Sequence, residues 1–268
     1  MKKIIENVYV ENEISICNSS IVVTKEGTVV IDTPMFPDSA KHWAKQAEDF
    51  GPVKYVINTE PHGDHTTGNC YFGGTLISHE GVRDTILANK IADVKGMLQM
   101  RRPDAEVPKD FRFRSPDIVY TEKLVFYLGG LTFNLTHMPG HTPFQTVVYV
   151  PEKRIVFTSD NISRAVPFFH QAVPDVWLKT LKEMEKLDVD YVVPGHGDVG
   201  GKEVFKEMYD NVTIWVNAVK ESIKQGWTVE QAQQKLDMSK KLPNLPKEPR
   251  TNDIIKMNIG AIYNYYKK

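Results

Sequence analysis

The chain has 268 residues, of which 41% are hydrophobic, 10% aromatic and 25% charged. These values are ordinary for a globular protein, and they exclude a disordered, collagen-like or membrane-spanning chain. With 33 Lys and Arg against 34 Asp and Glu, the formal net charge is −1. Because a protein that binds a phosphate backbone relies on an excess of positive charge, we expect no nucleic-acid partner.

The N-terminal segment does not resemble a secretion signal. Its apolar stretch is broken by Glu6, Glu11 and Glu13, whereas a signal needs a continuous apolar segment. No later stretch reaches the roughly 18 apolar residues of a membrane span. We therefore expect a cytoplasmic protein without a membrane partner. The two cysteines, Cys17 and Cys70, are expected to be reduced, buried thiols.

The first half of the chain alternates strands and helices. Apolar runs bounded by Gly and Asp, at residues 20–24 and 28–31, are typical of strands buried on both faces. Residues 101–116 contain three prolines and four arginines without a helical period, which predicts a loop or a lid. Strands are expected at residues 7–10, 14–24, 28–32, 54–58 and 75–78, and helices at residues 38–50, from 64, and at 81–100.

The second half repeats this pattern. Two sets of strands followed by helices predict a layered α/β architecture, with two sheets inside and helices outside. We expect one domain over residues 1–242, with a C-terminal loop (242–249) and helix packing on it within residues 243–268. Strands are expected at residues 123–128, 131–137, 146–150, 154–158 and 191–193, and helices at 174–187, 202–225, 228–236 and 251–266.

One of these helices has a marked apolar stripe. Between residues 205 and 223, apolar side chains recur three and four residues apart, which places them on one helix face. Such a stripe fits packing against the sheets, and it equally fits a contact in a homodimer.

Several motifs place metal-ligand side chains at the ends of predicted strands. The motif EPHGDH at residues 60–65 brings two histidines and a carboxylate onto one loop. The motifs PGHT and PGHG place His141 and His196 after later strands, and the Pro-Gly pair before each histidine indicates a sharp turn. Asp32 and Asp160 also end buried strands. Since neutral imidazole and carboxylate bind zinc and related divalent ions, this set predicts a metal site.

The order HGDH, PGHT, SD and PGHG resembles the metallo-β-lactamase superfamily, and within it the general cytoplasmic metallohydrolases. The resemblance implies a four-layer αβ/βα sandwich with a site at the edge of two facing sheets. It also implies that Asp160 bridges two ions and that Asp32 orients the ligand loop from behind. It assigns His62 and His141 to the first ion, and Asp64, His65 and His196 to the second.

Glu60 departs from the superfamily's usual pattern, because a histidine is expected at this position. With two divalent ions bound, the site's total charge is one unit lower with Glu60 than with a neutral histidine, so its water should be a weaker acid. Three interpretations are open. Glu60 binds the first ion and favours Mn²⁺ or Fe²⁺ there; or it leaves that site empty and acts as a general base; or the site is degenerate and Glu60 pairs with a nearby cation.

The resemblance implies a metal-dependent hydrolase of small molecules. A metal-bound hydroxide would attack an ester, lactone, lactam, thioester or related electrophile, and Asp64 or Glu60 would transfer the proton. Weak β-lactamase activity is expected as a side reaction. The expected cofactor is one or two divalent ions, Zn²⁺ first and Mn²⁺ or Fe²⁺ as alternatives. The loop after the SD motif carries Phe168, Phe169 and His170, which we expect to line the substrate pocket. An iron-dependent redox enzyme and a non-catalytic binding or sensor protein are the alternatives.

Overall fold

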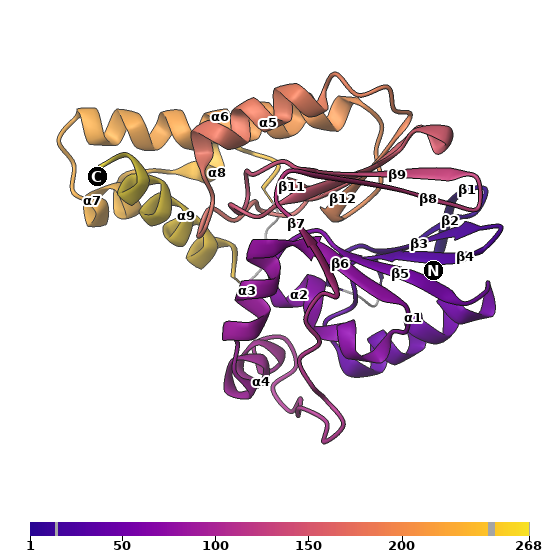
Figure 1. Cartoon of the computed structure of the whole chain (residues 1–268). Helices are drawn as coiled ribbons and strands as arrows, with labels where there is room; N and C mark the ends of the chain where they lie inside the picture. The colour runs from indigo at the N-terminus through magenta and orange to yellow at the C-terminus, as the bar shows by residue number, and fades with distance from the viewer. Residues whose placement is uncertain (14–15, 246–249, 268) are drawn as a thin grey trace.

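The computed structural model describes residues 1–13, 16–245 and 250–267. Its strands form two sheets that face each other, with helices on the outer side of each (Figure 1). The first sheet has the strand order β1-β2-β3-β4-β5-β6-β7, and the second has the order β12-β11-β10-β9-β8. Helix α1 lies below the first sheet in Figure 1, and helices α5 and α6 lie above the second. The predicted α/β sandwich of four layers is therefore confirmed.

The elements have the following bounds. The first sheet contains β1 (Lys2–Ile5), β2 (Val8–Glu11), β3 (Ser19–Thr24), β4 (Gly27–Ile31), β5 (Val53–Asn58), β6 (Thr75–His79) and β7 (Ile118–Tyr120). The second contains β8 (Lys123–Leu128), β9 (Leu131–His137), β10 (Thr146–Val150), β11 (Ile155–Ser163) and β12 (Tyr191–His196). The helices are α1 (Pro37–Asp49), α2 (Gly63–Thr66), α3 (Glu80–Ala88), α4 (Ile91–Gln99), α5 (Pro174–Met184), α6 (Glu203–Lys224), α7 (Val229–Lys235), α8 (Met238–Lys241) and α9 (Thr251–Tyr266), with short 3-10 turns η1 (Thr67–Tyr71) and η2 (Pro151–Lys153).

Strands β3 and β4 are buried on both faces, as their apolar runs predict. Ile21 and Val30 pack toward α1, in a cluster that also contains Trp43. Val22 and Val29 pack on the other face, in the cluster between the two sheets. Alternate side chains of a strand point to opposite faces, so a strand between two apolar layers needs apolar residues at every position.

The parallel strand pairs determine where the functional side chains meet. Strands β4, β5 and β6 run parallel in the first sheet, and β11 and β12 run parallel in the second. Parallel neighbours end at the same edge of a sheet. The segments that follow β4 and β5, together with the carboxyl ends of β11 and β12, therefore lie at one edge of the sandwich.

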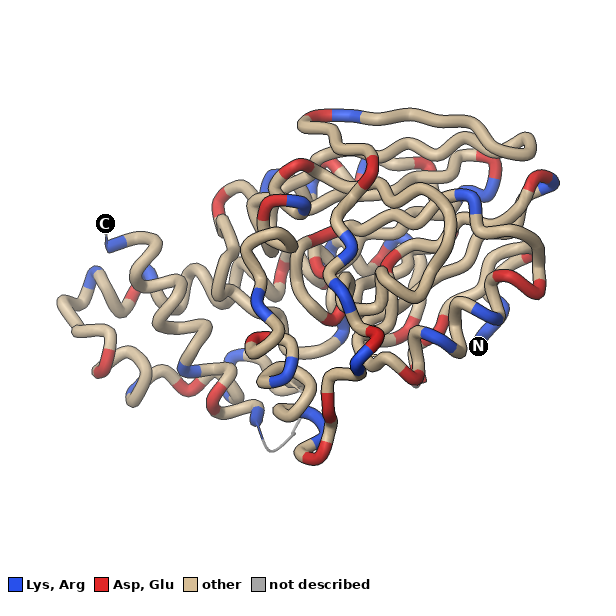
Figure 2. Tube along the Cα trace, turned by 60° about the horizontal axis from the view of Figure 1, so that its bottom comes forward, with Lys and Arg blue, Asp and Glu red and all other residues tan. Residues whose placement is uncertain are grey.

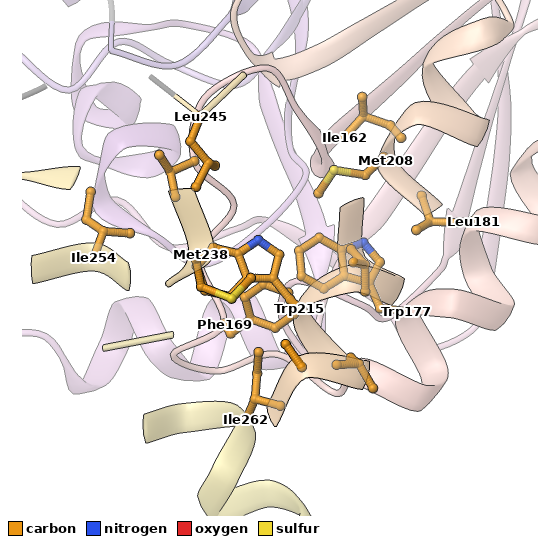
Figure 3. Close-up of a cluster of buried hydrophobic side chains, with 14 of the residues drawn as sticks. Ile162, Phe169, Trp177, Leu181, Met208, Trp215, Met238, Leu245, Ile254 and Ile262 are labelled. Atoms are coloured by element: carbon orange, nitrogen blue, oxygen red, sulfur yellow. The ribbon is translucent and has the colours of Figure 1, made fainter. Parts of the chain in front are cut away.

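The outer face of the second sheet is covered by the largest apolar cluster. It includes Trp177 of α5 and Trp215 of α6, both fully buried, and Ile262 of α9 (Figure 3). The apolar stripe of α6 is buried in this cluster, which confirms that the stripe packs within the chain. Helix α9 packs against the same cluster through its own isoleucines.

The structure differs from the sequence-based expectations in several elements. The helix expected at residues 81–100 is two helices, because the Asp93 carboxylate accepts a hydrogen bond from the Lys90 backbone N–H and starts a new helix there. The strand expected from residue 14 is observed from Ser19, and residues 14–15 lie outside the described chain. Residues 246–249 of the expected loop also lie outside it. The edge strands β1 and β7 were not predicted.

Residues 101–116 carry no helix or strand, as expected. Lys and Arg residues are interspersed with Asp and Glu along the trace in Figure 2. Of the helices in the described part of the chain, none combines the length and apolar character needed to cross a membrane.

Candidate metal centre

The loop after β5 is held in place by buried amides. The Asn58 side chain donates to the His65 carbonyl (3.1 Å) and to Asn69 Oδ1 (3.0 Å). Asn69 donates in return to Asn58 Oδ1 (2.7 Å), and Thr33 Oγ1 donates to the His65 carbonyl (3.2 Å). Buried amides that satisfy one another in this way fix a loop firmly. The histidines and carboxylates of this loop are therefore presented in one geometry.

The structure brings the metal-ligand candidates of the sequence together. The ligand atoms within each of three groups lie within 4.8 Å of one another. His62 Nδ1 and His141 Nε2 are 3.2 Å apart, and Asp160 Oδ2 lies 3.1 Å from His196 Nε2. The groups are Glu60, His62 and His141; Asp64, His65 and His196; and Glu60, His65 and Asp160.

Glu60 is completely buried in the middle of this cluster. Its Oε2 lies 2.9 Å from His62 Nδ1, and its Oε1 lies 3.1 Å from His65 Nε2. A third histidine, His141, has its Nε2 3.8 Å from the same carboxylate. Among the described residues, the ion-pair partners of Glu60 are these histidines. If Glu60 pairs with a cation of the described chain, that cation is therefore a protonated histidine of the cluster.

Several ligand atoms are buried without a hydrogen bond, which tests whether the residues fit divalent ions. Both carboxylate oxygens of Glu60, the Nε2 of His65 and the Oδ1 of Asp160 lack a well-aligned hydrogen bond within the described chain, although these carboxylate oxygens lie 2.9 to 3.3 Å from imidazole nitrogens. Each such group costs about 1–3 kcal/mol if it is left unsatisfied. Imidazole nitrogen and carboxylate oxygen are the donors that zinc binds in proteins. These converging ligand atoms therefore fit divalent ions.

Three of the site histidines are oriented by hydrogen bonds on the far side of the ring. In each of them Nδ1 donates away from the site, so that Nε2 faces the cluster. Asp32 is one of the acceptors, as expected, and it also accepts from the Thr59 backbone N–H (2.8 Å). The acceptors are Asp32 Oδ2 for His65 (2.9 Å), the Phe168 carbonyl for His141 (2.9 Å) and the Ile16 carbonyl for His196 (2.8 Å).

The glycines before His141 and His196 provide space for neighbouring atoms. The sharp turn expected at residues 194–195 is wrong, because Gly195 lies inside strand β12 and its φ is not positive. A Cβ at Gly195 would lie 1.8 Å from Asp160 Oδ1. A Cβ at Gly140 would lie 2.3 Å from the side-chain oxygen of Asn161, which accepts from the His141 N–H.

Asp160 is directed into the site by an irregularity in β11. It was expected to follow its strand but lies within it, one residue after Ser159. Ser159 has a φ of 49°, and the register between β11 and β12 shifts on both sides of it. Bulges of this kind redirect a side chain next to a functional site.

The buried charges shift one another's pKa. Burial disfavours the charged form of His62, but the Glu60 carboxylate outweighs it and raises the pKa of His62 to about 9. Asp160 likewise outweighs burial at His196 and raises its pKa to about 9. Burial dominates at His141 and lowers its pKa. The acidic groups around His65, Glu60 and Asp32 among them, likewise outweigh burial and raise its pKa well above the usual value. At neutral pH three of the histidines therefore hold protons that a bound cation would displace.

Two cavities adjoin the cluster. A cavity of about 600 Å³ is lined by His141, Asp160 and His196 and by apolar side chains that include Phe168. A smaller cavity of about 210 Å³ reaches His62 from another side. The first has the size of a small-molecule site.

Two of the predicted pocket residues lie elsewhere. Phe169 is 2% exposed, and its ring centroid lies 5.2 Å from that of Trp177 and 5.8 Å from that of Trp215 (Figure 3). Phe169 belongs to the core, so the prediction that it lines the pocket is wrong. Adjacent side chains of an extended segment point in opposite directions, and here it is Phe168 that lines the cavity. His170 is exposed and lines neither cavity.

Among the cavity residues that sequence reasoning missed, two are cationic, Arg101 and Arg250. Arg101 begins the arginine-containing segment 101–116, so its composition carried a signal. Arg250 belongs to no motif, and only the docking of α9 brings it near the site.

The model of the metallo-beta-lactamase superfamily matches residues 13–196. Over 211 residues the chain is 23% identical to the metallo-beta-lactamase type 2 of Bacteroides fragilis, covering 75% of this chain and 77% of that protein. Over 250 residues it is 22% identical to a linear primary-alkylsulfatase of Pseudomonas sp., covering 74% of this chain and 47% of the relative. The chain thus spans about half the length of that alkylsulfatase.

Solved structures show the same fold. The metallo-beta-lactamase from Pontibacter korlensis has a TM-score of 0.62 and 19% identity, covering 79% of this chain and 97% of that one. The sec-alkylsulfatase Pisa1 from Pseudomonas sp. has a TM-score of 0.74 and 16% identity, covering 98% of this chain and 49% of that one. The family match spans more than half of the chain and includes every residue of the ligand cluster. The chain belongs to the metallo-beta-lactamase superfamily and is a hydrolase of that fold.

Proposed function

We propose that this protein hydrolyses a small-molecule ester, or a related lactone, lactam or thioester, with two divalent ions, Zn²⁺ in first place. The observation that carries the proposal is the convergence of buried, unsatisfied carboxylate and imidazole atoms beside a cavity of about 600 Å³. Relatives named as a metallo-beta-lactamase and an alkylsulfatase support hydrolysis as the type of reaction.

The residues divide between two ion positions. When bound, divalent ions supply a Lewis acid and lower the pKa of water so that it can act as a nucleophile. Asp160 lies between the two groups, since its oxygens approach His65, His141 and His196. Glu60, His62 and His141 would hold one ion, and Asp64, His65 and His196 the other.

Asp64 is better placed than Glu60 to move a proton. Its side chain is 23% exposed, whereas that of Glu60 is completely buried. Burial favours the neutral form of Asp64, but His65 and His196 outweigh it and lower its pKa. An ionised carboxylate that is partly exposed beside the other ligand atoms can accept a proton from the attacking water and deliver it to the leaving group. We therefore assign proton transfer to Asp64 in addition to its part in holding an ion, and ion binding alone to Glu60.

The proposal is tested by removing and restoring the metal. The protein is stripped with a chelator, reloaded separately with Zn²⁺, Mn²⁺ or Fe²⁺, and assayed on 4-nitrophenyl esters, a thioester and a chromogenic β-lactam. Turnover should disappear on stripping, return on reloading, and fall at least about 100-fold in His196→Ala. The matched control His42→Ala removes an exposed imidazole of α1 and should retain full activity.

Turnover that survives both stripping and His196→Ala would contradict the proposal. Oxygen consumption by the iron-loaded protein without hydrolysis would favour the redox alternative. Binding of these compounds without turnover in any metal-loaded form would favour a binding protein.

A further inference from the structure

The larger cavity carries two cationic side chains beside the ligand cluster. Arg101 comes from the segment that follows α4, and Arg250 comes from the residue that precedes α9. Among the described residues that line this cavity, the charged ones outside the ligand cluster are these two arginines. Segments far apart in the sequence therefore bring positive charge to one cavity.

Neither arginine is engaged elsewhere in the described part of the chain. Both side chains are exposed, and neither guanidinium has a hydrogen bond or ion pair with a described residue. Two other arginines of the 101–116 segment are occupied: Arg102 binds Asp38, and Arg114 binds the Phe72 carbonyl. A guanidinium without an internal partner is free to form bidentate hydrogen bonds with a carboxylate, sulfate or phosphate.

The same cavity has apolar walls. Met100, Phe168 and Ile254 line it together with the arginines. Phe168 is held in place by the hydrogen bond from His141 to its carbonyl. Apolar walls with a few cationic groups suit a ligand that has an apolar body and one anionic end.

The smaller cavity is less suited to an anion. Arg112 and Arg114 line it, but Arg114 is already paired with Asp117 and donates to the Phe72 carbonyl, and Asp93 adds a carboxylate of the opposite charge. An anion there would approach a carboxylate as well as a cation, which weakens the net attraction.

We propose that the substrate carries an anionic group, which Arg101 and Arg250 bind, on an apolar body that contacts Met100, Phe168 and Ile254. This inference rests on the proposed hydrolase function and specifies its substrate class. Binding of the anionic end in this cavity fixes which bond of the substrate faces the ligand cluster.

The first test compares two esters with the same leaving group. The metal-loaded protein is assayed on neutral 4-nitrophenyl butyrate and on the anionic mono-4-nitrophenyl ester of glutaric acid. The wild type should prefer the anionic ester in kcat/KM. Arg101→Gln and Arg250→Gln should each lower kcat/KM for the anionic ester about fivefold, and the double variant at least about tenfold, with a much smaller effect on the neutral ester.

Two variants serve as controls. Arg112→Gln removes an exposed arginine from the smaller cavity. Lys123→Gln removes the same charge from β8, at the edge of the sheet opposite to β12. Both should keep the preference for the anionic ester. Equal losses on the two esters, or an equal loss of preference in either control, would overturn the proposal.

A binding measurement separates this proposal from the proposed function. Calorimetric titration with 1-hexanesulfonate and with neutral 1-hexanol requires no turnover. If hexanesulfonate binds more tightly and the double variant loses at least about tenfold in affinity, the anion site stands even where neither ester is hydrolysed. If both esters are hydrolysed without preference and hexanesulfonate binding is unchanged in the double variant, the anion site is overturned and the hydrolase stands.

Discussion

Glu60 gives this site its individual chemistry. A carboxylate that is completely buried among three imidazoles is stable only if its charge is compensated. In the absence of ions, protons on the histidines provide the compensation, as the raised pKa of His62 shows. With ions bound, Glu60 neutralises one positive charge more than a histidine would. We therefore expect a water bound at this metal centre to be a weaker acid than one bound at a centre with histidine at position 60.

Asp32 acts on the site through His65. Its carboxylate accepts from His65 Nδ1 and from the Thr59 backbone, and it sits at a φ of 56° directly after β4. Asp32→Asn replaces one acceptor oxygen by an NH₂ group. This change weakens the hydrogen bond that orients the His65 imidazole, or turns the ring over. Zinc affinity, measured by competition with a chromophoric chelator, should fall about 10–100-fold. The control Asp49→Asn, at an exposed position of α1, should bind zinc as the wild type does; equal affinity in both variants would contradict this role.

The pKa values of the site histidines predict how metal binding depends on pH. The pKa of His62 and of His196 is raised to about 9, so both imidazoles carry a proton at pH 7 when no ion is bound. Zinc must displace these protons, and rising pH removes them in advance. Zinc affinity should therefore increase from pH 7 to about 9, with protons released at pH 7. Titration calorimetry in two buffers of different ionisation enthalpy measures the release, and the absence of any release would refute the prediction.

Among the elements, strand β12 depends on Gly195, which the sequence analysis assigned to a sharp turn. A Cβ at Gly195 would lie 1.8 Å from Asp160 Oδ1 and 2.7 Å from the Asp160 backbone nitrogen. Gly195→Ala should therefore displace Asp160, lower the free energy of unfolding by about 1–3 kcal/mol and reduce the bound metal. Gly96→Ala in α4 is the control, since nothing lies within 4 Å of its added Cβ and alanine favours a helix. Denaturant titration and metal analysis check both, and a Gly195→Ala protein with full metal content would be the contrary result.

The elements differ in how well the sequence predicts them. The strands Lys123–Leu128 and Leu131–His137 and the helix Thr251–Tyr266 agree with their predicted bounds, because each has a clear period between turn residues. The break between α3 and α4 was missed, since it depends on a single capping bond by Asp93. The extension of β11 past Asp160 was missed as well, because a bulge at Ser159 leaves no periodic signal.

The ligand types of the site and the Asp32 carboxylate behind His65 were predictable, but the rest of the surroundings was not. Histidines and aspartates in short motifs predicted the cluster that the structure brings together. The acceptors behind His141 and His196 are backbone carbonyls, which every residue carries and no motif reveals. Arg250 reaches the cavity through the docking of α9, which depends on contacts distant in sequence.

At the scale of the whole molecule, the C-terminal helix supports the metal centre. Asn258 of α9 accepts from the Phe169 backbone N–H (2.9 Å) and donates to the Pro167 carbonyl (2.6 Å). The residue between them, Phe168, offers its carbonyl to His141. A helix outside the matched family region therefore holds the loop that orients a ligand histidine.

Asn258→Ala should break this connection. Two backbone groups of the loop lose their buried partner, which should lower the free energy of unfolding by about 1–3 kcal/mol and weaken zinc binding. The control Asn252→Ala changes an exposed position of the same helix and should leave both unchanged. Thermal unfolding and zinc titration measure the two effects. Normal zinc affinity in a destabilised Asn258→Ala protein would show that the helix supports the fold alone.

The most direct test of the account is the metal content of protein purified without added metal or chelator. Inductively coupled plasma mass spectrometry of the wild type, Glu60→Gln and the exposed control Glu48→Gln gives zinc, manganese and iron per chain. If Glu60 is a ligand, we expect about two ions in the wild type and in Glu48→Gln, and about one in Glu60→Gln. One ion in the wild type, unchanged in Glu60→Gln, would contradict the account and direct attention to Glu60 as a general base.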